Sequence, residues 1–476
     1  MFEPGEDAQS VSIHVSVLSS LTMSEQEQKP TLSTWQWFVN DLTNVKLVWV
    51  KLIFFLQSAG LVVLFPYLSI HMKSMGFSLE DTAWVTSAMP IADILAPPLA
   101  GIIADKMGNF RVFMCIITFL NGASSLVLLL IPRLQDSSLV EDVALNITLG
   151  STDISSSNAD WTTSFWSYLA SRGVLDVFRA SSLTLFEGAM SSIIREHGGD
   201  YGLQKVFGTL GSILFGPLAG LVIDLGSKVV GTEDYSFAFY LYFGLRAAAA
   251  MVMLKLSLTF RRGERKVLTN AWAVLHNLDV ISYLVAFFVL GVLWGYLENY
   301  LFWHLSDLGV KKIMMGVSLG AAALIGLPLS LFSKRLLQFF GHNWIVLMAL
   351  IVYVIRLTTY SVTLNPHIIV ALECLKPLSH SLIMISVFNF IMSVTPKEIT
   401  PTMNSIFGAA YFGVGRGLGG LIGGFLMENY GTLPTFKSFA VMAGVATFLY
   451  SLVTFWIKIR NRVSYSEVPL RNTLPT

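Results

Sequence analysis

Residues 54–76 read FFLQSAGLVVLFPYLSIHMKSMG, and residues 287–309 read FFVLGVLWGYLENYLFWHLSDLG. A shift of 233 positions superimposes the two stretches and leaves seven identities in 23 positions. The identities include Tyr67 with Tyr300 and His71 with His304. Each stretch also has the apolar length of roughly 20 residues that an α-helix needs to cross a bilayer. The repeat therefore predicts a membrane protein built by duplication.

A second repeat, at an offset of 204 positions, joins two glycine-rich segments. Small residues at helical spacing let helix backbones approach closely in lipid. Chance glycine enrichment would explain this repeat alone, but it explains both repeats together poorly. Parallel repeats related by an axis along the membrane normal place a binding site near the midplane, between the halves. The paired positions are Gly211 with Gly415, Gly216 with Gly420, Gly220 with Gly424, and Asp224 with Glu428.

The composition excludes several classes of protein. Of the 476 residues, 54% are hydrophobic and 13% are charged, whereas a soluble domain carries roughly 25% charged residues. A net charge of +1 argues against nucleic acid as a partner, because no basic block neutralises phosphates. Cys115 and Cys374 fall in apolar stretches and suggest neither disulfides nor a metal site.

Twelve segments are long and apolar enough to span a membrane. We therefore predict an all-α membrane protein with twelve transmembrane helices in two pseudo-twofold-related six-helix bundles. The bundles are residues 46–260 and 279–459, joined by a cytosolic linker, 261–278, and flanked by a disordered cytosolic tail, 1–45, and a C-tail, 460–476. The spans are 47–71, 82–104, 111–132, 164–194, 204–225, 236–259, 279–303, 313–333, 343–363, 367–395, 400–427 and 436–458.

Lysine and arginine in the loops indicate the orientation. With the N-terminus inside, fifteen lie in cytosolic segments and six on the other side, so both termini are predicted to be cytosolic. The N-glycosylation sequon at Asn146 falls in loop 133–163, on the predicted outer face. We expect a multi-pass glycoprotein of the plasma membrane or an endosomal membrane.

The loop after the second span carries a family motif. It reads GIIADKMGNFR from Gly101 to Arg111, with Asp105, Lys106 and Gly108 inside it. This resembles the signature loop of the major facilitator superfamily. The resemblance implies the major facilitator fold and a latch in which Asp105 faces a helix N-terminus, where a carboxylate is stabilised. These five residues are therefore predicted to gate the protein rather than to contact a solute.

The second half is similar to a narrower family, the major facilitator superfamily domain-containing protein 6 family, also called macrophage MHC class I receptor 2 homologues. The similarity lies in residues 291–309, 353–366 and 413–424. The family looks akin to proton-coupled oligosaccharide and nucleoside symporters, whose fifth helix begins with a motif that residues 201–211 resemble. Lys205 and Phe207 replace the arginine and tryptophan of that motif.

Charged residues inside the spans are the candidate functional residues, since each costs about 2.5–3.5 kcal/mol at the bilayer centre. Arg172, Asp176 and Arg179 share one face of the fourth span and are spaced to pair with one another. In the tenth span, Glu373, Lys376 and His380 fall in a similarly narrow arc. The alternative is that such charges form internal salt bridges that hold helices in register. The candidates for solute or proton binding are Asp93, Arg172, Asp176, Arg179, Glu298, Glu373, Lys376 and His380.

Four of the charges inside the spans have individual predictions. Asp93 has no basic neighbour one helical turn away, and an unpaired carboxyl in the membrane favours its protonated form. Asp93 is therefore the leading proton-binding candidate, followed by Glu298. We expect Arg416, set among glycines, to be structural and to meet a carbonyl or carboxylate, and Glu187 to belong to the gate.

These patterns predict a monomeric secondary transporter that moves a small polar solute by alternating access, coupled to protons. The alternative is a non-transporting surface receptor or scaffold that binds a partner through loop 133–163. An enzyme is not predicted, because no Walker loop, dinucleotide loop, nucleophile constellation or zinc pattern is present. No cofactor and no metal is expected.

Overall fold

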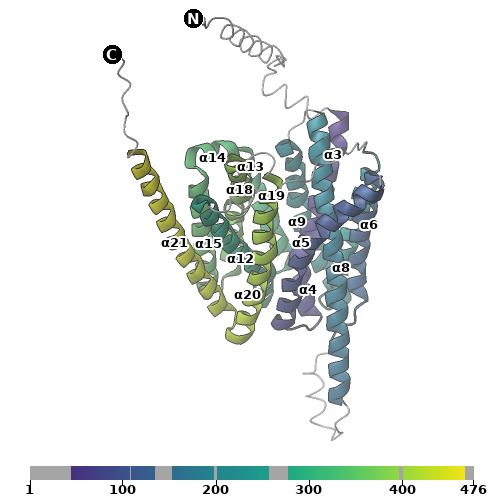
Figure 1. Ribbon diagram of the computed structural model, residues 1–476. Helices are drawn as coiled ribbons and strands as arrows, with labels where there is room; N and C mark the ends of the chain where they lie inside the picture. Colours follow the sequence, from purple (N-terminus) through teal and green to yellow (C-terminus); the bar gives the residue numbers. More distant parts are fainter. Residues whose placement is uncertain are drawn as a thin grey trace, which may run out of the picture. The chain divides into compact units, whose positions relative to one another are not determined.

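A computed structural model describes residues 44–107, 109–134, 153–197, 201–256, 277–395 and 400–466. The chain divides into a short unit, Met1–Val48, and a compact unit, Trp49–Thr476, to which all contacts below belong. The described residues form helices and no strand (Figure 1). The helices are α3 (Val45–Leu64), η1 (Phe65–Tyr67), α4 (Leu68–Ser74), α5 (Leu79–Met107), α6 (Phe110–Val127), η2 (Leu128–Leu130), α8 (Asp153–Glu196), α9 (Tyr201–Val230), α10 (Ser236–Met253), α12 (Leu278–Asp307), α13 (Lys312–Leu331), α14 (Ser333–Phe340), α15 (His342–Val362), α16 (Pro366–Leu372), η3 (Glu373–Leu375), α17 (Lys376–Ser379), α18 (Ser381–Val394), α19 (Thr400–Gly408), η4 (Ala409–Gly415), α20 (Arg416–Tyr430) and α21 (Thr432–Ser466).

The twelve predicted spans all coincide with helical segments. Within the described ranges, ten helices are long and apolar enough to cross a membrane. The other two predicted spans are 164–194, which lies inside α8, and 400–427, where the π-helix η4 separates α19 from α20. Four charged residues lower the hydropathy of α8 within its predicted span. The all-α membrane architecture is confirmed.

The two halves make the same internal contact, as the duplication predicts. A Cβ atom on Gly211 would clash with the carbonyl oxygen of Phe55, and one on Gly415 would lie 2.9 Å from the carbonyl oxygen of Phe288. The offset of 204 relates the two glycines, and the offset of 233 relates the two phenylalanines. Only glycine permits this distance, because any side chain would push the backbones apart.

The contacts between the halves follow the same symmetry. Helix α9 packs on α13, and α20 packs on α5. A Cβ atom on Gly220 would clash with the carbonyl of Lys312, and one on Gly424 would lie 3.1 Å from the carbonyl oxygen of Leu79. The offset of 233 also relates the position of Leu79 in the first half to that of Lys312 in the second. The two bundles are therefore related by a pseudo-twofold axis.

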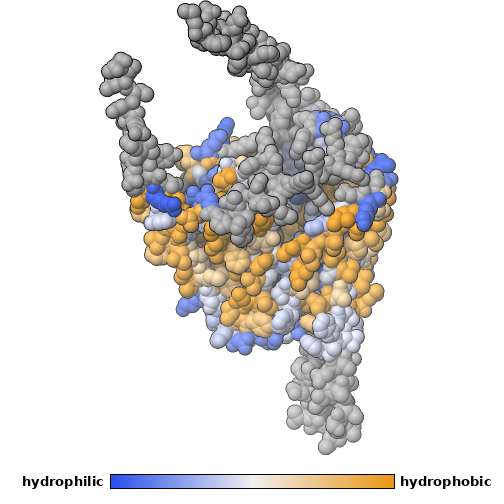
Figure 2. Space-filling model, viewed as in Figure 1, coloured by the Kyte–Doolittle hydropathy of each residue, from blue (hydrophilic) through white to orange (hydrophobic). Residues whose placement is uncertain are grey.

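Much of the outer surface is apolar. Along α21, Val441, Val445, Phe448 and Leu452 are exposed, while the opposite side of this helix packs on α15. The face shown in Figure 2 is mostly hydrophobic, and hydrophilic residues gather at its lower edge. Such a surface suits the hydrocarbon core of a bilayer.

Several predictions concern residues outside the described ranges. These are Asn146, most of the linker 261–278, and residues 1–43 and 467–476 of the tails. The glycosylation site and the boundaries at 46–260 and 279–459 remain predictions. Loop 133–163 is shorter than expected, because α8 already begins at Asp153.

Candidate functional site

The charged face of α8 forms a compact ion-pair cluster. Arg172 Nη1 lies 2.7 Å from Asp176 Oδ2, in an ion pair without hydrogen-bond geometry, and Arg179 Nε donates to Asp176 Oδ1 at 2.6 Å. Both guanidinium carbons lie 5.1 Å from the centre of the Phe65 ring, in the range of a cation–π interaction. The pairing predicted from the spacing of these residues is confirmed.

Asp93 of α5 is not an unpaired carboxyl, and that expectation is wrong. Its Oδ1 accepts from Arg179 Nη2 at 2.5 Å, and its Oδ2 accepts from Arg416 Nη1 at 3.1 Å. The partners lie 86 and 323 residues away in sequence. A search for basic residues one turn away on the same helix cannot find partners that other helices supply.

Arg416 connects the two halves. Its Nε lies 2.9 Å from Glu298 Oε2 of α12, within the second half, while its Nη1 reaches Asp93 in the first half. It sits at a close contact of α12 with α20, since a Cβ atom on Gly295 would lie 2.7 Å from the Arg416 Cα. The prediction that Arg416 meets a carboxylate is confirmed. Glu187 is exposed and is not among the residues of this network.

The central network therefore contains three carboxylates and three guanidinium groups, so its formal charge is zero. Asp176 is fully buried, whereas the side chains of Asp93 and Glu298 are 15% and 26% exposed. A buried ion pair is strongly destabilised when one partner is removed. The network thus ties α5, α8, α12 and α20 together near the middle of the chain's spans.

A second pair occupies the core of the second half. Arg356 of α15 pairs with Glu373 of η3, whose Oε1 also accepts from the Tyr360 hydroxyl at 2.7 Å. The 3₁₀ segment η3 interrupts the tenth span at this position. The expectation that Glu373, Lys376 and His380 lie in one narrow arc stays a prediction. Glu373 belongs to a pair with α15.

His380 belongs to an aromatic wall. Its ring stacks on Trp294 of α12 with centroids 5.2 Å apart, and its Nδ1 lies 2.9 Å from the Tyr411 hydroxyl. Tyr411 stacks on the same tryptophan at 5.3 Å, and the Arg416 guanidinium carbon lies 5.4 Å from the Trp294 ring centre. No pattern in the sequence marked Tyr411, because its π-helix, η4, lies among glycines that indicate only close packing.

Lys376 differs from the other candidate charges. It is partly buried, and among the described residues its ammonium forms no ion pair and no hydrogen bond, although its charge acts on Glu373. The charges of Lys376, Arg356 and Lys205 all act on the His380 imidazole. Since Arg356 is neutralised by Glu373, Lys376 and Lys205 leave positive charge beside the aromatic wall.

At one end of the molecule, which we call the closed end, the halves are tied together. Asp224 of α9 accepts from the backbone N–H groups of Lys312 and Ile313, at 3.1 and 2.9 Å. It thereby satisfies two of the free donors at the start of α13, where a carboxylate is also favoured by the helix dipole.

Two ion pairs and a tyrosine lie at the same end. Lys73 pairs with Asp307, and Lys312 Nζ lies 2.9 Å from Glu233 Oε1. The Tyr235 hydroxyl donates to Glu233 at 3.2 Å. Burial, and then the charge of Glu233, raise the pKa of Tyr235 above its ordinary value, so Tyr235 remains a neutral donor.

The signature loop is described only in part. Lys106 is exposed, and Arg111 Nη1 donates to the Leu256 carbonyl at 3.4 Å. A Cβ atom on Gly101 would meet no atom within 4 Å. Gly108 and the side chain of Asp105 lie outside what the structure describes, so the latch remains a prediction.

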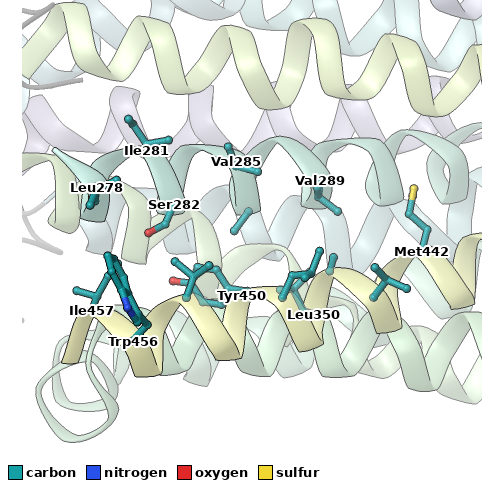
Figure 3. Close-up of a pocket in the computed structure, with 15 residues that line it drawn as sticks. Leu278, Ile281, Ser282, Val285, Val289, Leu350, Met442, Tyr450, Trp456 and Ile457 are labelled. Carbon is teal, nitrogen blue, oxygen red and sulfur yellow. The ribbon is translucent and has the colours of Figure 1, made fainter. Parts of the chain in front are cut away.

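A groove of about 470 Å³ lies elsewhere, between α12, α15 and α21 (Figure 3). Its walls are apolar, with Leu278, Val285 and Trp456 among the lining residues. It contains none of the candidate charges and is not the site of polar chemistry.

Comparison with known proteins agrees with this architecture. Residues 47–438 match the family described as MFS_1 like family. The major facilitator superfamily domain-containing protein 6-like protein B of Xenopus laevis is 23% identical over 181 residues, which are 38% of this chain and 30% of that protein. The 6-like protein of Danio rerio is 25% identical over 288 residues, 58% of this chain and 51% of that protein. The chain thus matches between about a third and a half of the length of these relatives.

Two solved structures have the same fold. A mutant of the nucleoside transporter NupG aligns with a TM-score of 0.68 at 16% identity, over 85% of this chain and 99% of that one. The human organic anion transporter MFSD10 (TETRAN) aligns with a TM-score of 0.50 at 14% identity, over 85% and 98%. Since the family match covers more than half of the sequence, the chain belongs to the MFS_1 like family of the major facilitator superfamily.

Proposed function

We propose that this chain is a secondary active transporter, a symporter that moves a small polar solute by alternating access and couples the movement to protons. The observation that carries the proposal is the Asp93–Arg416–Glu298 network, which joins the two halves through ionisable groups. Ionisable groups within spans mark ion and solute pathways.

The distribution of contacts between the halves supports alternating access. The contacts of α5 with the glycines of α20 run from Leu79 to Pro90, and Ile94 meets Gly413 of η4. Beyond Ile94, the buried positions of α5 are only Ala96, Ala100 and Ala104. The halves thus pack closely from the closed end to mid-span and less closely beyond it, which is the arrangement expected of one state of a rocking transporter.

The aromatic wall and Lys376 are the proposed solute site. Two irregular segments, η3 and the π-helix η4, bring His380 and Tyr411 together there. Interrupted membrane helices often form binding sites, and π-helices often occur at functional sites. The free ammonium of Lys376 would bind an anionic or hydroxyl-rich group, and the rings would cover the rest of the solute.

Asp93 and Glu298 are the proposed proton carriers. Their partial exposure gives water access that the buried Asp176 lacks. Protonation of Asp93 would remove the negative charge that holds Arg416 of the second half. Proton uptake would therefore weaken an ion pair that crosses between the halves and would couple protonation to their movement.

The test is solute uptake into liposomes that contain the purified protein, under an imposed pH gradient. The panel contains nucleosides and organic anions, the solutes named for the two similar structures. We expect Asp93→Asn to lower gradient-driven uptake at least tenfold. Glu80→Gln, which changes an exposed carboxylate outside the network and outside the predicted gate, is the matched control and should leave uptake unchanged.

Exchange without a gradient separates coupling from folding. A variant that still exchanges solute but ignores the gradient has lost only proton coupling. Absence of flux for every solute, from protein that melts cooperatively, would overturn the proposal.

A further inference from the structure

One arginine in the core of the first half has no counter-ion. Arg246 of α10 is only 2% exposed, yet among the described residues it forms neither an ion pair nor a hydrogen bond. Its one close partner is the Tyr242 ring, 5.0 Å from the guanidinium carbon. By contrast, Arg172, Arg356 and Arg416, which are similarly buried, each pair with a carboxylate.

The surrounding helices are shaped to hold this arginine. A Cβ atom on Gly60 of α3 would lie 3.2 Å from Arg246 Nε, and one on Gly122 of α6 would lie 2.8 Å from Arg246 Cβ. Two different helices therefore carry glycine where the arginine passes. A side chain at either position would displace it, so the guanidinium lies in a fitted space between α3, α6 and α10.

The polar neighbours of Arg246 are also unsatisfied. Asn121, next to Gly122, is fully buried; its Oδ1 accepts from the Tyr242 hydroxyl at 2.8 Å, and its Nδ2 has no partner. Gln57, one turn before Gly60 on the same face of α3, is 2% exposed, and neither of its amide atoms has a partner. Buried polar groups are nearly always hydrogen-bonded, so unpaired donors from three helices point to a missing acceptor.

The charge of Arg246 decides what that acceptor is. Water would supply hydrogen bonds but would leave a full positive charge unbalanced in a low-dielectric interior, which is costly. An anion supplies both the acceptors and the charge. We propose that Arg246, with the amide groups of Asn121 and Gln57, binds a small anion inside the first bundle, either a free halide or a carboxylate group of a solute.

The test measures thermal unfolding of the purified full-length protein and does not depend on transport. Sodium isethionate, whose bulky sulfonate is neither a halide nor a carboxylate, is replaced at constant ionic strength by chloride or bromide in one arm, and by formate or acetate in the other. An anion that binds only the folded state raises Tm in a saturable way. A rise with halides alone assigns the site to free halide, and a rise with carboxylates alone assigns it to a solute carboxylate.

Two variants test the residues. In Arg246→Met, we expect the anion dependence to disappear while Tm in isethionate is unchanged or higher, because an apolar side chain replaces an unbalanced charge. Gly60→Ala keeps the arginine but crowds its Nε, so the midpoint anion concentration should rise several-fold. Arg335→Met removes an exposed arginine of α14 and is the control that should retain the full dependence.

A second measurement locates the anion directly. Anomalous scattering from bromide should give a peak beside the Arg246 guanidinium if the site takes halide. If no anion raises Tm, or if Arg246→Met retains the same dependence, the proposal is overturned. Because no step measures flux, failure here leaves the transport proposal standing.

Discussion

At the scale of single residues, the candidate charges differ in what surrounds them. Asp176 is buried between two guanidinium groups, Asp93 and Glu298 share Arg416, and the Lys376 ammonium forms no ion pair among the described residues. A buried and fully paired charge holds helices in place, whereas a partly exposed or unpaired charge is available to a proton or a solute. The ion-pair partners and the exposure of a candidate charge, rather than its residue type, therefore indicate whether its role is structural or functional.

Asp176→Asn should destabilise the protein strongly. The change leaves Arg172 and Arg179 buried beside a neutral amide, and breaking a buried pair costs about 3–5 kcal/mol. Thermal unfolding of the purified protein measures the effect. Glu187→Gln on the same helix is the control and should stay within about 0.5 kcal/mol, because its side chain is exposed. Equal melting of the two variants would contradict the buried cluster.

Lys376→Gln should weaken solute binding without unfolding the protein. Loss of a charge-assisted contact is worth about 1.5–3 kcal/mol, so KM for uptake should rise at least tenfold while Tm changes little. Lys376→Arg retains a cation and should restore most of the affinity. A matched fall in Tm would instead assign Lys376 a structural role.

At the scale of helices, glycine sets how closely α9 and α13 approach. A Cβ atom on Gly220 would lie 2.6 Å from the Ile313 Cα, and helix backbones at that distance tolerate no added side chain. The repeat places the equivalent glycine of α20 against the start of α5. The interface between the halves thus has two close helix contacts, one on each side of the pseudo-twofold axis.

Gly220→Ala should disrupt one of these contacts. Overpacking at a rigid backbone costs about 1–3 kcal/mol, so Tm should fall. Gly244→Ala is the matched control, since a Cβ atom there meets nothing within 4 Å. In a helix interior that change should be neutral or stabilising by about 0.5–1 kcal/mol. If both variants melt alike, the close approach of α9 and α13 is not real.

At the scale of the whole molecule, the closed end opposes separation of the halves. Asp224 is its main polar tie, because it satisfies two backbone donors of α13 across the interface. The Lys73–Asp307 pair lies at the same end, with side chains 31% and 41% exposed. Such an exposed pair is worth about 0–1 kcal/mol in water, so it contributes less than Asp224.

Asp224→Ala should therefore favour opening of the closed end. A cysteine replacing the buried Phe302, which packs against Tyr67 of the other half with ring centroids 5.4 Å apart, reports the opening through its rate of maleimide labelling. Cys115 and Cys374, both partly buried and free, are first replaced by serine. If Asp224 stabilises the closed end by about 1–2 kcal/mol, its removal should make labelling roughly 5- to 30-fold faster. Lys73→Ala should increase the labelling rate less than Asp224→Ala does. A larger increase would show that the Lys73–Asp307 pair, and not Asp224, is the main polar contact of the closed end.

Much of the architecture was predictable, and the errors have a common cause. The spans, the duplication and the pairing along α8 depend on spacing within a single helix, and all three are confirmed. The prediction for Asp93 failed because its partners come from α8 and α20. The pairing of Glu373 with Arg356 was missed for the same reason, because Arg356 belongs to α15.

The sequence alone established a duplicated, twelve-span membrane protein of the major facilitator type. Apolar length, glycine spacing and the repeats can be recognised within single helices. The fold was needed to show that Asp93 joins two arginines, that the Lys376 ammonium lies beside the aromatic wall, and that Arg246 meets no carboxylate among the described residues. In a medium of low dielectric, the state of a charge depends on groups a few ångströms away, and the fold brings those groups from distant parts of the chain.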